Sequence, residues 1–300
     1  MRRGGLAIAT FLIYVAALSG ADDKPATAWP VWPTGCDRFE GPQKTECLRS
    51  IAFDFGALAR YASANAALPA PKPVERRVVF FGDSITDNWD AEGFGGFFPG
   101  KPYVNRGISG QTTAQMLLRY RADVIDLNPA VVVILAGTND VAGNAGPATD
   151  VAIRNNFRSF ADIASSNGIE LVLCSILPVL DGKPDADGKP RVWTDGRPLA
   201  RINGLNRWLQ EYANANGYLY LDYATPMTAP DGTLKAELTD DGLHPNAAGY
   251  KVMGPLVEAA IAKALGARQP VRRPPPVPAM PLPPAPPAPP PVPTPPARNP

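Results

Sequence analysis

Three residues in two distant segments have the types that nucleophilic acyl transfer requires. Ser84 supplies a hydroxyl directly after Gly82-Asp83. His244 is the single histidine of the chain, so any imidazole base must be this residue. Asp241 precedes it by three residues, near enough to bond the second imidazole nitrogen and hold its tautomer. We therefore predict Ser84 as nucleophile, His244 as general base and Asp241 as the acid that orients it.

Acyl transfer also needs hydrogen-bond donors aimed at the oxyanion that develops on the carbonyl oxygen. The backbone amides of Ser84 and Gly110 and the side-chain amide of Asn139 are the candidates. Each residue also has a structural interpretation: Ser84 and Asn139 as helix caps, Gly110 as a turn residue, and His244 before Pro245 as a surface loop residue. Their joint occurrence at four predicted strand ends favours a functional site.

The elements that must position these residues alternate along the chain. Four runs rich in apolar residues lie at 78–82, 131–136, 169–177 and 218–222, and a weaker one lies at 102–106. Runs that are apolar rather than alternating are typical of strands covered on both faces of a parallel sheet. Helical periodicity lies at 112–127, 150–167, 199–216 and 246–265. This alternation predicts an α/β fold with a doubly wound layer. In such sheets ligands bind at the carboxyl ends of the strands, where all the polar segments fall.

At these segments the chain resembles the GDSL/SGNH hydrolases. The matching blocks are Gly82-Asp83-Ser84, Gly110, Gly137-Thr138-Asn139-Asp140 and Asp241-x-x-His244, and the resemblance covers about residues 75–265. It implies a flavodoxin-like three-layer α/β/α sandwich with a central five-stranded parallel sheet, and a hydrolase domain at 71–268. It implies the same catalytic roles for Ser84, His244 and Asp241, and an oxyanion hole made by Ser84, Gly110 and Asn139. The first block continues with Ile85 where the family has leucine, a volume-conserving change.

Other catalytic and cofactor sites match less well. The α/β-hydrolase family is a poorer match, because Gly-x-Ser-x-Gly is missing and the predicted acid lies just before the histidine. Asp185, Asp187 and Gly188 lack the spacing and closing glutamate of a calcium loop, and the segment 93–96 lacks the lysine of a phosphate loop. We therefore expect neither a metal nor a cofactor.

The two ends of the chain differ in composition from the predicted hydrolase domain. Arg2 and Arg3 precede an apolar run and then small residues, which predicts a signal peptide at 1–21 and an exported protein, periplasmic or extracellular; an uncleaved membrane anchor is the alternative. Residues 22–70 are predicted to be an N-terminal extension with a helix at 46–66 packed on the main domain. Residues 269–300 contain 17 prolines, which predicts an extended, disordered tail.

The three cysteines fit an exported protein with at most one bridge. Cys36 and Cys47 lie in the same N-terminal segment, so we predict that they pair. Cys174 lies in an apolar run, which predicts a buried and inert thiol.

The balance of charged residues limits the classes of partner that the chain can bind. Five of the 29 basic residues lie at the two ends, namely Arg2, Arg3, Arg272, Arg273 and Arg298, so residues 22–268 carry 24 basic residues against 28 acidic ones. This balance and the absence of basic-aromatic motifs argue against a nucleic-acid partner. We expect a small-molecule or glycan ester as substrate and no stable membrane insertion after signal cleavage. The sequence does not predict an oligomeric state.

The sequence determines the substrate less well than it determines the type of reaction. Asp83, Trp89 and Trp193 are candidate substrate contacts, although such aromatics are often core residues. Ester hydrolysis of short-chain acyl groups, acetyl above all, on extracellular carbohydrates or small molecules is the leading function. Lysophospholipase or arylesterase activity, or O-acyl transfer at the same site, are alternatives. A non-catalytic binding module is a third class, which the complete set of Ser84, Asp241 and His244 argues against.

Overall fold

The computed structural model describes residue 36 and residues 40–72, 74–91, 96–184 and 188–266. The predicted signal peptide at 1–21 and the predicted proline-rich tail at 269–300 lie outside these residues. Cys36 and Cys47 form a disulfide, as predicted.

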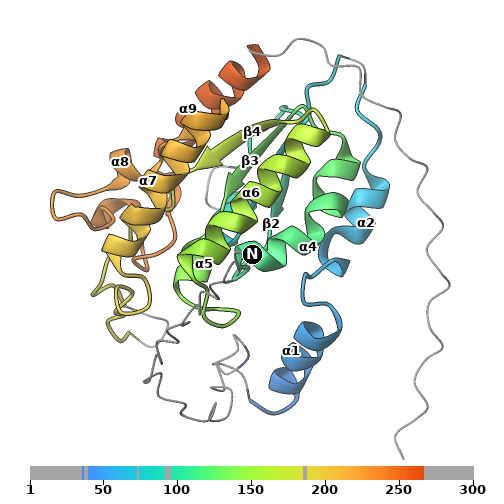
Figure 1. Cartoon of the computed structure of the whole chain (residues 1–300). Helices are drawn as coiled ribbons and strands as arrows, with labels where there is room; N and C mark the ends of the chain where they lie inside the picture. Colours follow the sequence, from blue (N-terminus) through green and yellow to red (C-terminus); the bar gives the residue numbers. More distant parts are fainter. Residues whose placement is uncertain (1–35, 37–39, 73, 92–95, 185–187, 267–300) are drawn as a thin grey trace, which may run out of the picture. The chain divides into compact units, whose positions relative to one another are not determined.

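A five-stranded parallel sheet forms the centre of the fold (Figure 1). Its strands are β1 (Val78–Gly82), β2 (Tyr103–Gly107), β3 (Val131–Leu135), β4 (Glu170–Cys174) and β5 (Leu219–Leu221). They lie in the order β2-β1-β3-β4-β5, with β2 and β5 at the edges. All residues of β1 and β3 are buried, as continuous apolar runs in a covered parallel sheet should be. The predicted α/β/α sandwich with a five-stranded parallel sheet is confirmed.

Helices cover both faces of this sheet. The α-helices are α1 (Gly41–Phe53), α2 (Ala59–Ala67), α3 (Ser84–Asp87), α4 (Thr113–Asp123), α5 (Thr138–Val141), α6 (Asp150–Ser166), α7 (Leu199–Asn216), α8 (Ala224–Met227) and α9 (Ala247–Gly266). The short 3₁₀ helices are η1 (Asn88–Asp90), η2 (Ile125–Leu127) and η3 (Ala236–Leu238). Helices α4, α6 and α7 pack on one face through a core that includes Phe81 and Phe157, and Figure 1 shows them side by side. Helix α9 packs on the other face, in a core that includes Phe80 and Met253.

The helix predicted at 46–66 is two helices. Helix α1 ends at Phe53, and Asp54 then accepts hydrogen bonds from the amides of Leu58 and Ala59, at 2.8 and 2.9 Å. This side chain satisfies the first amides of α2, and Ala57 adopts a positive φ of 53°. The hydrophobic periodicity continues across the break, which is why the pattern alone predicted one helix.

Helix α2 is held to the edge of the sheet by polar contacts. The Tyr61 hydroxyl donates to the Gly107 carbonyl, and Asn65 Nδ2 lies 2.6 Å from Asp123 Oδ1. Arg106 Nε donates to Asn65 Oδ1 at 2.8 Å. These bonds join the N-terminal extension to β2 and α4.

The strand predicted at 169–177 ends earlier, at Cys174. Beyond it, the amide and the carbonyl of Ile176 bond the side chain of Asn206, at 2.7 and 2.8 Å, instead of a neighbouring strand. The side chain of Asn206, on α7, thus replaces a neighbouring strand as the partner of Ile176. The apolar run therefore continues past the end of β4.

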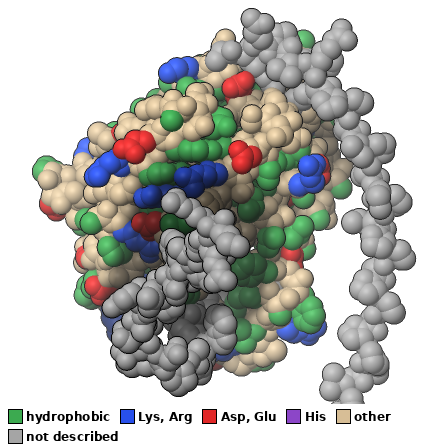
Figure 2. Space-filling model, viewed as in Figure 1, with side chains coloured by type: hydrophobic (Ala, Val, Ile, Leu, Met, Phe, Trp, Pro, Cys, Tyr) green, Lys and Arg blue, Asp and Glu red, His purple; other side chains and the backbone are tan. Residues whose placement is uncertain are grey.

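The surface seen in Figure 2 carries basic, acidic and apolar side chains interspersed over the helices. An ion pair between Arg201 and Asp150, 2.8 Å apart, is one example of this mixing. Among the residues described, no helix has both the length and the apolar character needed to cross a bilayer.

Candidate active site

Ser84, His244 and Asp241 come together although 160 residues separate Ser84 from His244. His244 Nε2 lies 2.9 Å from Ser84 Oγ, and His244 Nδ1 lies 2.6 Å from Asp241 Oδ2. With its proton on Nδ1, a neutral imidazole donates to the carboxylate and accepts the serine hydroxyl at Nε2. This arrangement allows the imidazole to remove the Ser84 proton.

The end of β1 places Ser84 at this position. Gly82 ends the strand, and a side chain there would collide with Thr86 and with the Leu135 carbonyl, so only glycine lets the chain turn this tightly. Asp83 then caps α3 by accepting a hydrogen bond from the Ile85 amide at 3.0 Å. Ser84 is therefore the first residue of a helix at the carboxyl end of a central strand.

In the loop that carries Asp241 and His244, backbone amides bond the side-chain carboxylate of Asp241. Asp241 Oδ1 accepts the amides of Leu243 and His244, at 2.9 and 2.8 Å, while Oδ2 faces the imidazole. Gly242 allows this turn with a φ of 87°, and a side chain there would strike the Leu180 carbonyl. Partial burial opposes ionisation of Asp241, but the hydrogen bonds from His244 outweigh it and hold its pKa well below the usual range. Asp241 is therefore a carboxylate at neutral pH.

Three hydrogen-bond donors with spare capacity lie at this edge of the sheet. The amide of Ser84, at the helix start, has no backbone or side-chain acceptor among the described residues. The same holds for the amide of Gly110, which is exposed and has a φ of 81°. Asn139 Nδ2 donates one of its two hydrogens to the Gln111 carbonyl at 3.0 Å, and the other stays available.

Two further side chains orient Asn139, and the sequence analysis did not identify them. Asn144 Nδ2 and an Arg197 amino group both donate to Asn139 Oδ1, at 2.9 and 3.3 Å. Arg197 also donates to Thr138 Oγ1 at 3.0 Å and is 6% exposed. Because the oxygen is fully occupied, the Asn139 amide cannot flip. Asn144 and Arg197 lie in loops outside the recognised blocks, so neither spacing nor periodicity marks them.

Comparison with known proteins supports this interpretation. Residues 80–252 match the model of the GDSL-like lipase/acylhydrolase family, which is more than half of the chain and includes Ser84, Asn139 and His244. The chain belongs to this family.

Solved structures of GDSL-like proteins share this fold. The chain is 41% identical to a GDSL-like lipase from Bacteroides thetaiotaomicron, with a TM-score of 0.63 over 70% of this chain and 99% of that one. It is 38% identical to a candidate acylhydrolase from Bacteroides fragilis, with a TM-score of 0.64 over 71% and 99% of the two chains. The uncharacterized lipoprotein YqeF of Bacillus subtilis is 29% identical over 158 residues, which are 45% of this chain and 62% of the lipoprotein. That match spans less than two thirds of the relative's own length.

Asp83 of this GDSL-like chain is buried, with 1% of its surface exposed. Its Oδ1 caps α3, whereas its Oδ2 has no hydrogen-bond partner among the described residues. Burial raises the pKa of Asp83 to about 6, opposed by the Ile85 amide and by the charges of His244 and Arg197. The sequence predicts a substrate contact here, but the structure turns this carboxyl inward, because it must cap the helix that starts at Ser84.

The two tryptophans predicted to contact substrate differ in position. Trp89 is 4% exposed and packs against Phe80, Phe98 and Tyr250, with ring centroids 4.9–5.9 Å apart, so it is a core residue. Trp193 is partly exposed, and its indole donates to the Asp241 carbonyl at 2.7 Å. Trp193 therefore lies beside the loop that carries Asp241 and His244, and of the two tryptophans it is the one with an exposed part.

Possible metal ligands and the third cysteine are the remaining reactive groups in the described part of the chain. No group of three or more His, Cys, Asp or Glu side chains is arranged there to hold a metal ion. Cys174 is fully buried on β4, and burial raises the pKa of its thiol far above the usual range.

Proposed function

We propose that this GDSL-family chain is a serine ester hydrolase that uses Ser84, His244 and Asp241 as its catalytic triad. The observation that carries the proposal is the continuous hydrogen-bonded chain from Ser84 Oγ through the imidazole to Asp241, with links of 2.9 and 2.6 Å. The inward-facing histidine is the only one in the sequence, so no other imidazole competes for the role.

The geometry supports a two-step reaction. Ser84 Oγ attacks the ester carbonyl carbon as its proton passes to His244 Nε2, and a tetrahedral oxyanion forms. Collapse breaks the bond to the alcohol, which leaves with the proton from His244. Water then attacks the acyl-Ser84 ester with the same proton relay, and the acid and free Ser84 are released. The Asp241 carboxylate stabilises the imidazolium that forms in each step.

The oxyanion is the charge that must be stabilised in both steps. We assign this role to the amides of Ser84 and Gly110 and to the free hydrogen of Asn139 Nδ2. These donors are already fixed by the start of α3, the turn at Gly110 and the bonds to Asn139 Oδ1. Such preorganised donors need no rearrangement during the reaction.

We further propose short-chain acyl esters, acetyl esters above all, of carbohydrates or small molecules as the substrates. Trp193 beside the triad is partly exposed, and the guanidinium groups of Arg191 and Arg197 each lie over its ring, 5.0 Å from the centroid. A sugar can therefore contact the exposed edge of the indole rather than its face. Lysophospholipid or aryl esters remain the second substrate class, and acyl transfer to an alcohol follows if that alcohol replaces water at the acyl-enzyme.

Export of the protein is part of the proposal. Disulfides persist in oxidising compartments, so the Cys36–Cys47 bridge is consistent with a periplasmic or extracellular location. The N-terminal sequence, with its charged start and apolar run, and the similarity to a bacterial lipoprotein agree with it.

A substrate panel tests the function. Purified protein is assayed with p-nitrophenyl esters of two to sixteen carbons, with acetylated glycans, and with an added alcohol to detect transfer. We expect hydrolysis that is fastest for two-carbon esters, reduced by about 10⁴–10⁶-fold in Ser84→Ala. Ser166→Ala, an exposed serine on α6, is the control and should match the parent. Substantial activity in purified Ser84→Ala would refute the proposal.

A further inference from the structure

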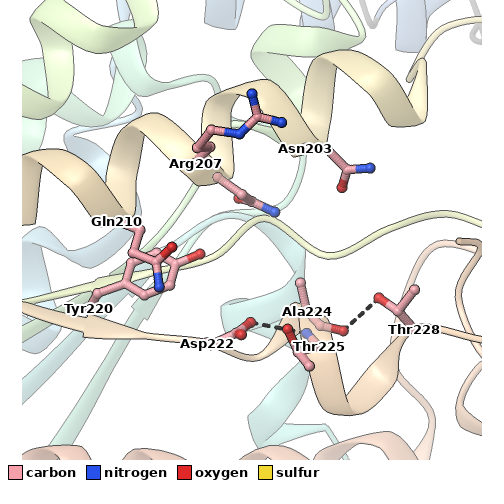
Figure 3. A pocket seen from close by; sticks show the side chains of 9 residues that line it. Asn203, Arg207, Gln210, Tyr220, Asp222, Ala224, Thr225 and Thr228 are labelled. Atoms are coloured by element: carbon pink, nitrogen blue, oxygen red, sulfur yellow. Dashed lines mark hydrogen bonds between the residues drawn. The ribbon is translucent and has the colours of Figure 1, made fainter.

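A polar cavity of about 510 Å³ lies outside the triad, between α7 on one side and the end of β5 with α8 on the other (Figure 3). Asn203, Asn206, Arg207 and Gln210 line it from α7, and Tyr220, Asp222 and Thr225 line it from β5 and α8. In the part of the chain that the structure describes, Ala224 gives it its single aliphatic side chain. Its lining therefore combines amides and hydroxyls with one guanidinium, one carboxylate and one aromatic ring.

This cavity opens at the same edge of the sheet as the triad. All five strands are parallel, and β5 is three strand intervals from β1 in the order β1-β3-β4-β5. With neighbouring strands about 4.8 Å apart, the ends of β1 and β5 are separated by about 14 Å. Helix α7 begins at Leu199, two residues after Arg197 contacts Asn139, and Asn203 follows about 6 Å along its axis. The start of α7 thus connects the lining of the cavity to Arg197, which contacts Asn139.

Part of the lining is rigid and part is free to bind. Asn206 is fixed because both of its amide atoms bond the backbone of Ile176. Asp222 accepts the Thr225 amide at 3.0 Å, as Figure 3 shows. The side chains of Asn203 and Gln210, in contrast, make no hydrogen bond to any described residue. The side-chain amides of Asn203 and Gln210 are therefore available to a ligand, in a cavity where Asn206 and Asp222 are already held in place.

The charges and shape of the cavity favour a neutral, hydroxyl-rich ligand. Arg207 and Asp222 carry opposite charges, so neither an anion nor a cation is selected by net charge. Side-chain amides donate and accept together, which matches the paired donor and acceptor character of sugar hydroxyls. The Tyr220 ring adds an apolar surface with a polar end.

We propose that this cavity binds a distal sugar unit of a glycan whose acyl ester lies at Ser84. The inference rests on the proposed esterase function, and it narrows the substrate class to esterified oligo- or polysaccharides. A glycan that enters the cavity extends from the triad across the ends of β3, β4 and β5. Distal binding should therefore raise kcat/KM for long glycans and leave small esters unaffected.

Substrate length provides the kinetic test. The variant Asn203→Ala/Gln210→Ala is compared with the parent on p-nitrophenyl acetate and on chemically acetylated mono- and pentasaccharides. We expect about a tenfold loss of kcat/KM on the pentasaccharides, since two hydrogen bonds are removed, and no change on the small esters. Gln43→Ala, an exposed amide on α1, is the matched control. Equal losses on all substrates, or no loss on the pentasaccharides, would overturn the proposal.

A binding measurement separates this inference from the catalytic proposal. Calorimetry with Ser84→Ala uses three unacetylated β-1,4-linked pentasaccharides, of glucose, xylose and N-acetylglucosamine. Binding of at least one, weakened in Ser84→Ala/Asn203→Ala/Gln210→Ala, supports the cavity even if no ester is hydrolysed by the parent protein. Absence of binding for all three, in a protein whose parent hydrolyses small esters, would refute the cavity and leave the esterase intact.

Discussion

Two buried polar clusters lie on either side of Gln111, and they differ in how completely their hydrogen bonds are satisfied. In the first, Arg119 is fully buried and donates to Gln111 Oε1, to Asp123 and to the carbonyls of Arg106 and Gly82. Its guanidinium also lies 4.3 Å from the centroid of a ring, that of Phe81. All three of its nitrogens are engaged, so this cluster joins α4 to the ends of β1 and β2.

The second cluster, the catalytic edge, keeps unused capacity. The amides of Ser84 and Gly110 have no acceptor within the described residues, and one oxygen of Asp83 has no partner there. Gln111 links the clusters, because its carbonyl accepts Asn139 while its side chain accepts Arg119. Of these two clusters, the one in which every guanidinium nitrogen is bonded joins elements of the fold, and the one with spare donors lies beside Ser84. Substitutions in the two clusters should therefore separate stability from turnover.

The largest effect should come from His244→Gln. Without an imidazole the Ser84 proton has no acceptor, and kcat should fall by about 10⁴–10⁶-fold. The melting temperature should change little, because the side chain is partly exposed. Turnover near that of the parent in purified His244→Gln would identify a different base.

Arg119→Met should have the opposite effect to His244→Gln, because it should lower stability and leave turnover unchanged. It leaves Asp123 charged and buried without its partner, which costs about 3–5 kcal/mol in the free energy of unfolding. Urea denaturation measures this loss, and kcat per folded molecule should stay near that of the parent. Arg121→Met, on the exposed side of the same helix, is the control. A variant that is stable but slow would show that this cluster also supports catalysis.

Asn139 and Arg197 should act as one unit at the catalytic edge. Asn139→Ala should lower kcat by about 10²–10³-fold with little change in KM, as loss of one oxyanion donor does. Arg197→Met should lower kcat in the parent but cause almost no further loss in Asn139→Ala, because it acts by fixing that amide. Arg201→Met, which removes bonds to Asp150 and Val141, is the control. Additive losses would show that Arg197 acts by another route.

The smallest effect concerns pH and Asp83. Since burial raises the pKa of Asp83 to about 6 from 3.8, the folded state holds a proton that the unfolded state releases between about pH 4 and 6. Stability therefore falls as pH rises through this window, and Asp140, with a pKa also raised by burial to about 6, adds to the fall. Asp83→Asn should be more stable than the parent by about 1–3 kcal/mol at pH 7.5 and similar at pH 4. Thermal unfolding across pH measures this, with exposed Asp126→Asn as control.

The sequence predicts the central architecture well because each layer has its own periodicity. The buried runs at 78–82 and 131–136 alternate with helical patterns, and the order of the blocks places Ser84 and His244 at one edge. It does not predict the break at Asp54, since a capping side chain interrupts a hydrophobic pattern that continues past it.

Long-range polar contacts are the features that the sequence pattern misses. Arg197 reaches Asn139 across 58 residues, and Asn206 replaces a strand partner for Ile176. Trp89 is read from the sequence as a substrate contact because it follows the nucleophile closely. Its burial depends on Tyr250, which is far away in the sequence.

Covalent labelling tests most directly whether Ser84 is a nucleophile activated by His244. A fluorophosphonate reacts when a serine oxygen displaces fluoride from phosphorus and the base takes the serine proton. Intact-mass analysis and peptide mapping of the parent should find one adduct, on Ser84. The adduct should be absent in Ser84→Ala and form far more slowly in His244→Gln. Labelling at another residue, or at the parent's rate in His244→Gln, would contradict the triad.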